Sequence, residues 1–247
     1  MKLLTLLTLS FLTAPALASE ITSPFYIPKG GHVLSQTQAS FSKMKQTPGK
    51  RTYHRLLNEE ISLGLGANFS AILSGNLNWT HQKQRTSLSF PHKTGYSTGV
   101  KGQWALKGLL AQTAILYHQT NNVNFAPRRT LEGHLRFGKE LKTLTPYLHL
   151  VGNFPLNART EFNNPMYRGE TGVFQNINNK MTLDTALYLQ YDKNVKGKSY
   201  GIQAEWSYLP VSWVAIGLNG SWQARGHAKY SEKTYHKSIG IKTTFSF

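Results

Sequence analysis

The side chains of this chain that could do chemistry are charged groups and histidines spaced two residues apart within alternating segments. Glu132, His134 and Arg136 form one such run. Because successive side chains of a β-strand point to opposite faces, each run shares one face of its strand. Acids and bases that face the same way pair with one another or line a watery passage. The polar faces carry Glu60, Lys101, Glu132, His134, Arg136, His149, Glu170, Asp184, Glu205 and Lys242, with Arg168 near a strand end.

One pair has the spacing of a nucleophile and its base. His236 and Ser238 lie on one strand face, where an imidazole could take the hydroxyl proton. The outer-membrane phospholipase family carries a His-x-Ser pair of this kind. The surrounding motif of that family is missing here, as is an acid or Asn to orient the histidine. We therefore expect no enzyme, and without a phosphate loop, zinc or calcium signature we expect no cofactor or metal.

The elements that must position these side chains are β-strands. From Tyr235 to Phe247 apolar and polar residues alternate, which is typical of a strand with one apolar and one polar face. Twelve segments follow this pattern, although the count falls to ten if the weakly alternating fifth and eighth are not strands. They are Val33–Lys43, Tyr53–Leu65, Phe69–His81, Gly95–Leu106, Leu109–Thr120, Thr130–Glu140, Leu144–Phe154, Tyr167–Asn176, Lys180–Tyr191, Ser199–Tyr208, Val211–Gln223 and the segment that ends at Phe247.

The connections between these segments alternate between short and long. Gly66–Asn68, Lys107–Gly108 and Leu209–Pro210 are short, whereas Gln82–Thr94, Asn121–Arg129 and Pro155–Met166 are longer. Tyr and Trp residues gather near the strand ends, as in the aromatic girdles of membrane barrels.

In its strand pattern and its terminal Phe247 the chain resembles Gram-negative outer-membrane β-barrel proteins, a porin-like class, with no subfamily identified. The resemblance implies an all-β fold, a transmembrane antiparallel up-and-down barrel of about twelve strands. It also implies that Phe247 belongs to a signal for the barrel assembly machinery. The apolar strand faces would then meet lipid and the polar faces a lumen. A soluble β-sandwich is the alternative fold.

The N-terminal part of the chain divides into two segments. A lysine, an apolar run and the small-x-small site Ala16–Ala18 predict a secretory signal peptide over residues 1–18, whose removal would leave 229 residues. Residues 19–31 contain prolines that exclude them from the sheet, so we expect a periplasmic leader. The alternative is a partial plug in the barrel mouth, anchored by Phe25 and Tyr26. Residues 32–247 would form the barrel.

The composition agrees with an exported membrane protein. The chain has 28 Lys and Arg against 11 Asp and Glu, a formal charge of +17, and no Cys. The signal peptide argues against nucleic acid as the partner of this positive charge. Many of the basic residues fall in the longer connections, where they could pair with the phosphates of lipopolysaccharide. That set is Lys50, Arg51, Lys83, Arg85, Arg128, Arg129, Lys196, Lys198, Arg225 and Lys229.

These features favour a small porin-like channel in the Gram-negative outer membrane for hydrophilic solutes, anionic ones among them. The alternative is a filled structural or adhesive barrel that binds lipopolysaccharide, and a membrane-embedded hydrolase is a third. The interior charges do not decide between the first two functions, because a twelve-stranded barrel lies between the filled eight-stranded and the open sixteen-stranded sizes.

Overall fold

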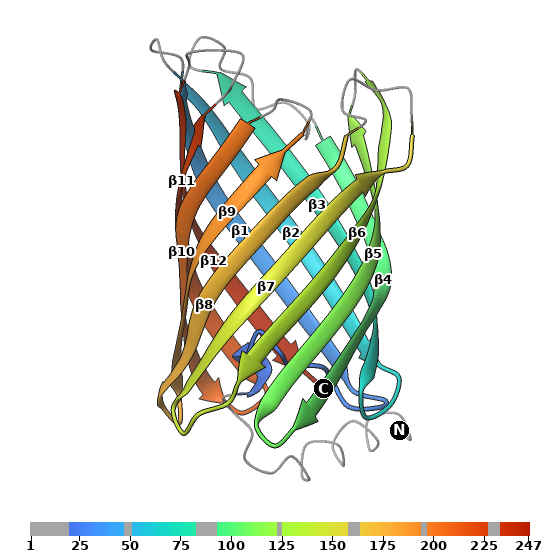
Figure 1. Cartoon of the computed structure of the whole chain (residues 1–247), viewed down its shortest axis with the longest axis vertical. Coiled ribbons are helices and arrows are strands. Elements are labelled where there is room, and N and C mark those ends of the chain that lie inside the picture. Colours follow the sequence, from blue (N-terminus) through green and yellow to red (C-terminus); the bar gives the residue numbers. More distant parts are fainter. Residues whose placement is uncertain are drawn as a thin grey trace, which may run out of the picture.

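Twelve antiparallel strands close into one barrel in the computed structural model, which describes residues 20–46, 51–82, 93–122, 125–157, 164–193, 197–226 and 233–247 (Figure 1). Each strand pairs with its sequence neighbours, and β1 pairs with β12 to close the ring. The predicted fold class and strand number are thereby confirmed. The predicted signal peptide lies outside the described residues.

The strands are 12 to 15 residues long, as tilted membrane-crossing strands require. No helix in the described ranges is long and apolar enough to cross a membrane. The elements are the 3-10 helix η1 (Glu20–Thr22), β1 (Val33–Gln46), β2 (Arg51–Gly64), β3 (Phe69–Gln82), β4 (Lys93–Leu106), β5 (Leu109–Asn122), β6 (Phe125–Lys139), β7 (Leu144–Pro155), β8 (Met166–Asn178), β9 (Met181–Asp192), β10 (Gly197–Val211), β11 (Val214–Gly226) and β12 (Lys233–Ser246).

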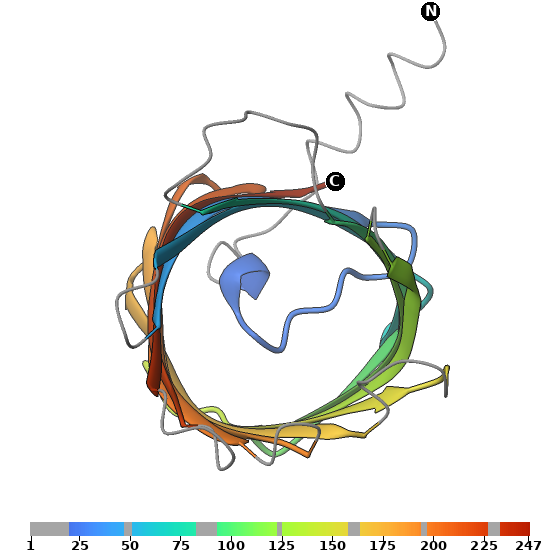
Figure 2. The same cartoon turned by 90° about the horizontal axis from the view of Figure 1, so that it is seen from above.

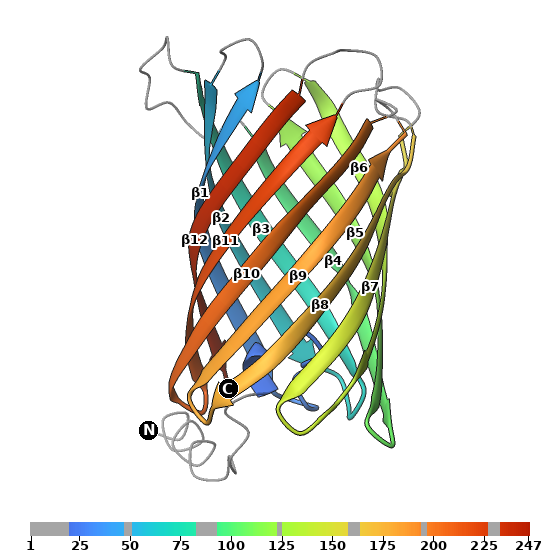
Figure 3. The ribbon, with the colours of Figure 1, turned by 60° about the vertical axis from the view of Figure 1, so that its left-hand side comes forward.

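The tight turns lie at the same end of the barrel as the C-terminus (Figure 3). Between β4 and β5 the turn consists of Lys107 and Gly108 alone, with φ of 49° and 78°. Positive φ at both central residues is the geometry that matches the twist of a two-residue hairpin. The predicted short turn at this position is therefore confirmed, and the barrel has a defined short-turn end.

Two predicted connections are wrong. Leu209–Pro210 is not a turn, because β10 continues to Val211 through a register shift between Tyr208 and Val211, and the chain turns at Ser212–Trp213. A strand tolerates proline at such an irregularity, where no ladder hydrogen bond is needed. The loop expected over Asn121–Arg129 is largely strand as well, since β6 begins at Phe125.

The outward face of the barrel is apolar. Side chains such as Leu73, Leu187 and Ile239 are more than half exposed. Aromatic groups pack against one another near both ends, including Phe69 on Trp104, with ring centroids 5.8 Å apart, at the short-turn end. An apolar band between aromatic girdles is the lipid-facing surface of a membrane barrel.

Glu59 is an exception on this outward face. The pairing of β2 with β1 and with β3 runs without a register shift, so no bulge turns the side chain inward. Its carboxylate accepts hydrogen bonds from the hydroxyls of Ser35, at 2.9 Å, and Thr37 on β1. Both hydroxyls also lie on the outward face. Glu59 therefore faces the lipid side in the middle of β2, while Glu60 faces the interior.

The chain before β1 lies inside the barrel at the short-turn end (Figure 2). We call Glu20–His32 the inner segment. Phe25 and Ile27 in it are buried, Phe25 to 1% exposure. Ile21 packs with Leu34 and Leu209 of the barrel wall. The sequence left two positions open for this segment, a periplasmic leader and a partial plug. These contacts are those of a plug that lies in the barrel mouth.

Candidate functional site: the barrel interior

The inward side chains of β6–β10 are rich in charge, and we call them the charged wall. Glu170 on β8 lies at its centre and is 5% exposed. Its carboxylate accepts hydrogen bonds from Arg168, at 2.7 Å, and from the Gln203 amide, at 3.0 Å. Tyr147 donates its hydroxyl to Asp184 at 2.9 Å. Partners on β7, β8 and β10 thus fix the acids of this wall by hydrogen bonds, and Arg168 adds the opposite charge.

A second cluster in the charged wall joins histidines to an acid. Glu132 lies 2.7 Å from His134 and 3.5 Å from His118, and Asn153 donates to its other oxygen at 3.0 Å. His134 is stacked on His149, with ring centroids 5.3 Å apart. Within the described residues no group of three or more His, Asp or Glu is arranged to hold a metal ion. The recorded hydrogen bonds tie this cluster into the wall.

The opposite side of the interior is mostly uncharged. We call the inward side chains of β1–β3 the amide wall, because Gln36, Gln38, Asn58, Asn76 and Asn78 lie there with several Ser and Thr and with Glu60 as the single charge. In the described part of the chain these five amide side chains have no hydrogen-bond partner. Unpaired amides are free to bind water or a polar solute.

Every ion pair among the described residues runs along the barrel wall. Each joins residues of one strand or of strands no more than two positions apart, as in Lys242 on β12 with Glu205 on β10, at 2.6 Å, and Arg225 on β11 with Asp192 on β9, at 2.8 Å. None reaches across the interior to the opposite wall. The ion pairs thus follow the wall and do not bridge the centre of the barrel.

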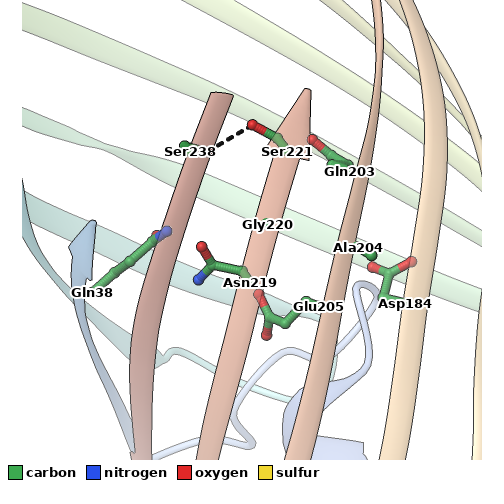
Figure 4. A pocket seen from close by; sticks show the side chains of 9 residues that line it. All are labelled: Gln38, Asp184, Gln203, Ala204, Glu205, Asn219, Gly220, Ser221 and Ser238. Atoms are coloured by element: carbon green, nitrogen blue, oxygen red, sulfur yellow. Dashed lines mark hydrogen bonds between the residues drawn. The ribbon is translucent and has the colours of Figure 1, made fainter. Parts of the chain in front are cut away.

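A cavity of about 220 Å³ lies against five consecutive strands, β9–β12 and β1 (Figure 4). Gln38 and Asn219 face it from one side, and Asp184, Gln203 and Glu205 face it from the other. Ser221 and Ser238 close one edge of it and are hydrogen-bonded at 2.7 Å. A lining of amides, hydroxyls and carboxylates suits water and hydrophilic solutes.

A second cavity, of about 250 Å³, lies against the inner segment. Three cations face it, Lys101, Arg136 and Lys242, and two acids, Asp184 and Glu205. Because Asp184 and Glu205 line both cavities, the two spaces adjoin. Lys242 is paired with Glu205, whereas neither Lys101 nor Arg136 has a carboxylate within ion-pair distance among the described residues. This narrow part of the interior is therefore a net positive site.

All eleven side chains that the sequence placed on the polar faces line the interior. The sequence did not predict which of these side chains contact one another, nor that Tyr147, Gln203 and Asn219 belong to the site. The alternation could have found Gln203 and Asn219, since Gln203 lies two residues before Glu205 and Asn219 lies on the inward face of β11. Interior residues include Glu60, Lys101, Glu132, His134, Arg136, His149, Arg168, Glu170, Asp184, Glu205 and Lys242.

The basic residues expected at lipopolysaccharide fall into three groups. Arg51, Arg129 and Lys198 are exposed on strands near the end opposite the short turns. Arg225 points inward to its ion pair with Asp192, and Arg128 also lies on an inward position and is half-buried. The others, Lys50, Lys83, Arg85, Lys196 and Lys229, lie outside the described residues.

The pair considered for hydrolysis has another arrangement. His236 and Ser238 both face the interior, as the spacing predicts. Ser238 Oγ, however, lies 2.7 Å from Ser221 Oγ, and its recorded hydrogen bond in the described part of the chain is to that hydroxyl. A serine paired with another serine is not activated by a base.

Comparison with known proteins identifies the fold. No family model and no curated protein sequence matches the chain. Among solved structures, the COG4313 outer membrane channel from Pseudomonas putida F1 matches with a TM-score of 0.70 and 7% identity, over 91% of this chain and 98% of that one. NanC porin matches with a TM-score of 0.55 and 14% identity, over 84% and 98%.

A third match is the transport unit of the autotransporter AIDA-I from Escherichia coli, with a TM-score of 0.52 and 12% identity, over 94% of this chain and 98% of that one. Identities this low show a shared fold. The chain therefore has the fold of porin-like outer-membrane β-barrels, with a polar interior of paired charges and unpaired amides.

Proposed function

We propose that this barrel is an outer-membrane channel for small hydrophilic solutes and that it prefers anions. The single observation that carries the proposal is the cavity of about 250 Å³ beside the inner segment, where three cations face two acids. A positive charge at a narrow point attracts anions and repels cations, because the field in a confined aqueous path is poorly screened.

Lys101 is the residue on which this preference depends most. Lys242 is offset by Glu205, and Arg136 is engaged by the Pro24 carbonyl and, at 3.3 Å, by Gln112. Lys101 has no ion pair or side-chain hydrogen bond recorded in the described part of the chain and lines the cavity directly. Its ammonium group therefore remains available to a passing carboxylate or phosphate.

Current through the purified protein in planar lipid bilayers tests both parts of the proposal. We expect steady conductance and, under a salt gradient, a reversal potential of the sign that indicates anion preference. Lys101→Gln should lower that preference. Lys237→Gln, which removes an outward-facing lysine of β12, is the matched control and should change nothing. A silent barrel would contradict the channel and favour the filled structural barrel, while equal effects of the two variants would contradict the role of Lys101.

The expected partners are part of the same proposal. Export through the predicted signal peptide and insertion by the barrel assembly machinery through Phe247 would bring the chain to the outer membrane. Arg51, Arg129 and Lys198, exposed near the end opposite the short turns, would meet lipopolysaccharide phosphates there. Binding of purified lipopolysaccharide that falls in the triple Gln variant would support this contact.

A further inference from the structure

Phe25 is the largest fully buried side chain by which the inner segment contacts the barrel wall. Phe25 forms a buried cluster with Tyr147, Phe174 and Ala186, against which Leu110 packs, and we call these four residues the Phe25 socket. The Phe25 ring meets the Tyr147 ring edge-on with centroids 6.3 Å apart. At 1% exposure it is among the most buried large side chains of the molecule. Burying a phenylalanine this fully stabilises the docked segment by about 2 kcal/mol.

Polar contacts reinforce this anchor. Arg136 donates a hydrogen bond to the Pro24 carbonyl, and its guanidinium lies 5.8 Å from the centroid of the Phe25 ring. A cation over an aromatic face adds attraction. Thr182 donates to Thr22 at 3.1 Å. Arg136 of the charged wall thus contacts both the backbone and the Phe25 ring of the inner segment.

The other end of the inner segment is attached to a different part of the wall. The Gly31 amide donates to the Gly64 carbonyl, and the Gly64 amide donates to the His32 carbonyl, each at 2.9 Å. A side chain at Gly64 would collide with the Lys29 carbonyl, so the absence of one lets the two backbones meet. Tyr26 lies with its hydroxyl 3.3 Å from that of Ser246. The segment therefore crosses the interior from β12 and β2 to the Phe25 socket (Figure 2).

The inner segment also forms one side of the positive cavity. Ile21, Thr22, Ser23, Pro24 and Tyr26 line it from the segment, opposite the cations and acids of the wall. Any solute that passes this level must move between the segment and those charges. The width of the passage here depends on where the segment lies.

We propose that the inner segment is the constriction of the channel, that Phe25 in its socket holds it in place, and that this fixed position sets the size limit for solutes. The inference rests on the proposed channel function. Release of Phe25 would free the middle of the segment, which would then be held by the packing of Ile21, by the Thr22–Thr182 hydrogen bond and by the backbone pairing with Gly64, and the barrel would offer a wider passage.

Two substitutions release the anchor from opposite sides. Phe25→Ala removes the ring, while Gly138→Ala leaves the segment untouched but places a Cβ 2.6 Å from Phe25 Cζ. Such a contact forces the ring out of its place. Gly133→Ala on the same strand is the matched control, because nothing lies within 4 Å of the Cβ that it adds.

Single-channel conductance and the swelling of protein-containing liposomes in sugars of increasing size measure the result. We expect conductance at least to double in Phe25→Ala and in Gly138→Ala, with larger sugars admitted, and no change in Gly133→Ala. Retained heat-modifiable migration in gel electrophoresis shows that each variant still forms the barrel. Unchanged conductance and size limit in both anchor variants would overturn the proposal.

A reversible lock gives a second test. The chain has no cysteine, so Thr22→Cys with Thr182→Cys adds a single pair at a site where the two hydroxyls lie 3.1 Å apart. In the Phe25→Ala background the oxidised pair should hold the segment and keep conductance low, and a reductant should raise it. Conductance that is the same in the oxidised and the reduced protein would count against the constriction.

The outcomes separate this inference from the channel function. If the wild type conducts and the anchor variants have the same conductance and size limit as the wild type, the channel function is supported and the constriction is rejected. A silent wild type with conducting anchor variants contradicts a channel that is open at rest but supports the constriction, because the segment would then be what closes the barrel. Silence in all folded variants rejects both.

Discussion

The charged wall and the amide wall face each other across one interior, and they use their polar groups in opposite ways. In the charged wall Glu170 is bound by Arg168 and Gln203, and Glu132 by two histidines and Asn153. In the amide wall the Gln and Asn side chains have no partners among the described residues. Ion pairs and hydrogen bonds therefore fix most of the charged groups of one wall, whereas the amides of the other wall are free to bind a passing solute.

This difference follows from the cost of burying each kind of group. An unpaired charge in a narrow interior is expensive, so acids and bases must be placed beside one another and are then held rigidly. An amide costs far less to leave to water. Conduction requires groups that bind a solute weakly enough to release it. The amide wall meets that requirement, and the charged wall sets the field in which it operates.

Loss of Glu170 should have the largest effect on stability. Glu170→Ala removes the buried carboxylate that pairs with the half-buried Arg168, and breaking such a pair costs about 3 kcal/mol. Urea unfolding of the protein in lipid vesicles, followed by tryptophan fluorescence, measures this. Asn58→Ala removes a side chain of the amide wall and should change the free energy of unfolding by less than about 0.5 kcal/mol. Similar losses of unfolding free energy in the two variants would show that the two walls contribute equally to stability.

The same substitution made on both walls should separate their electrostatics. Gln38 and Gln203 line the same cavity from opposite sides. Gln38→Glu adds a carboxylate beside Lys242, its cross-strand neighbour on β12, which is already paired with Glu205, and it should reduce or reverse the anion preference. Gln203→Glu places its charge against Arg168, which already donates to Gln203 at 2.9 Å, so the shift in reversal potential should be smaller. Gln38→Asn is the neutral control. Equal shifts from the two Glu variants would remove the distinction.

Period-two alternation predicts the strands and their inward residues because the barrel separates lipid from water along every strand. It fails at Pro210, where an irregular strand end tolerates a proline that usually marks a turn. It also leaves the pairings unknown. Lys242 reaches Glu205 across β11 because Gly217 lies between them, near the Glu205 carboxylate. Such contacts depend on register and on side-chain size over three strands, which no single segment specifies.

The period-two alternation does not predict the position of the inner segment either. Its prolines exclude it from the sheet, but they do not predict whether it lies outside or inside the barrel. The Phe25 socket holds it inside, and the members of this socket come from four different strands, β5, β7, β8 and β9. Only a folded barrel brings them together.

We expect the smallest effect on stability from substitutions of the adjacent acids Glu59 and Glu60 on β2. These two residues lie on opposite faces of one strand, so they allow the lipid-facing side to be compared with the interior. Glu60 faces the polar interior, whereas Glu59 faces lipid with the hydroxyls of Ser35 and Thr37 as its recorded partners. A carboxylate in the lipid-facing band is unfavourable, so Glu59→Leu should stabilise the barrel in vesicles by about 1 kcal/mol after the lost hydrogen bonds are counted. Glu60→Leu should bring no such gain, and urea midpoints of the two variants measure the difference. A destabilised Glu59→Leu would mean that the outward carboxylate contributes more to the β1–β2 seam than its two hydrogen bonds account for.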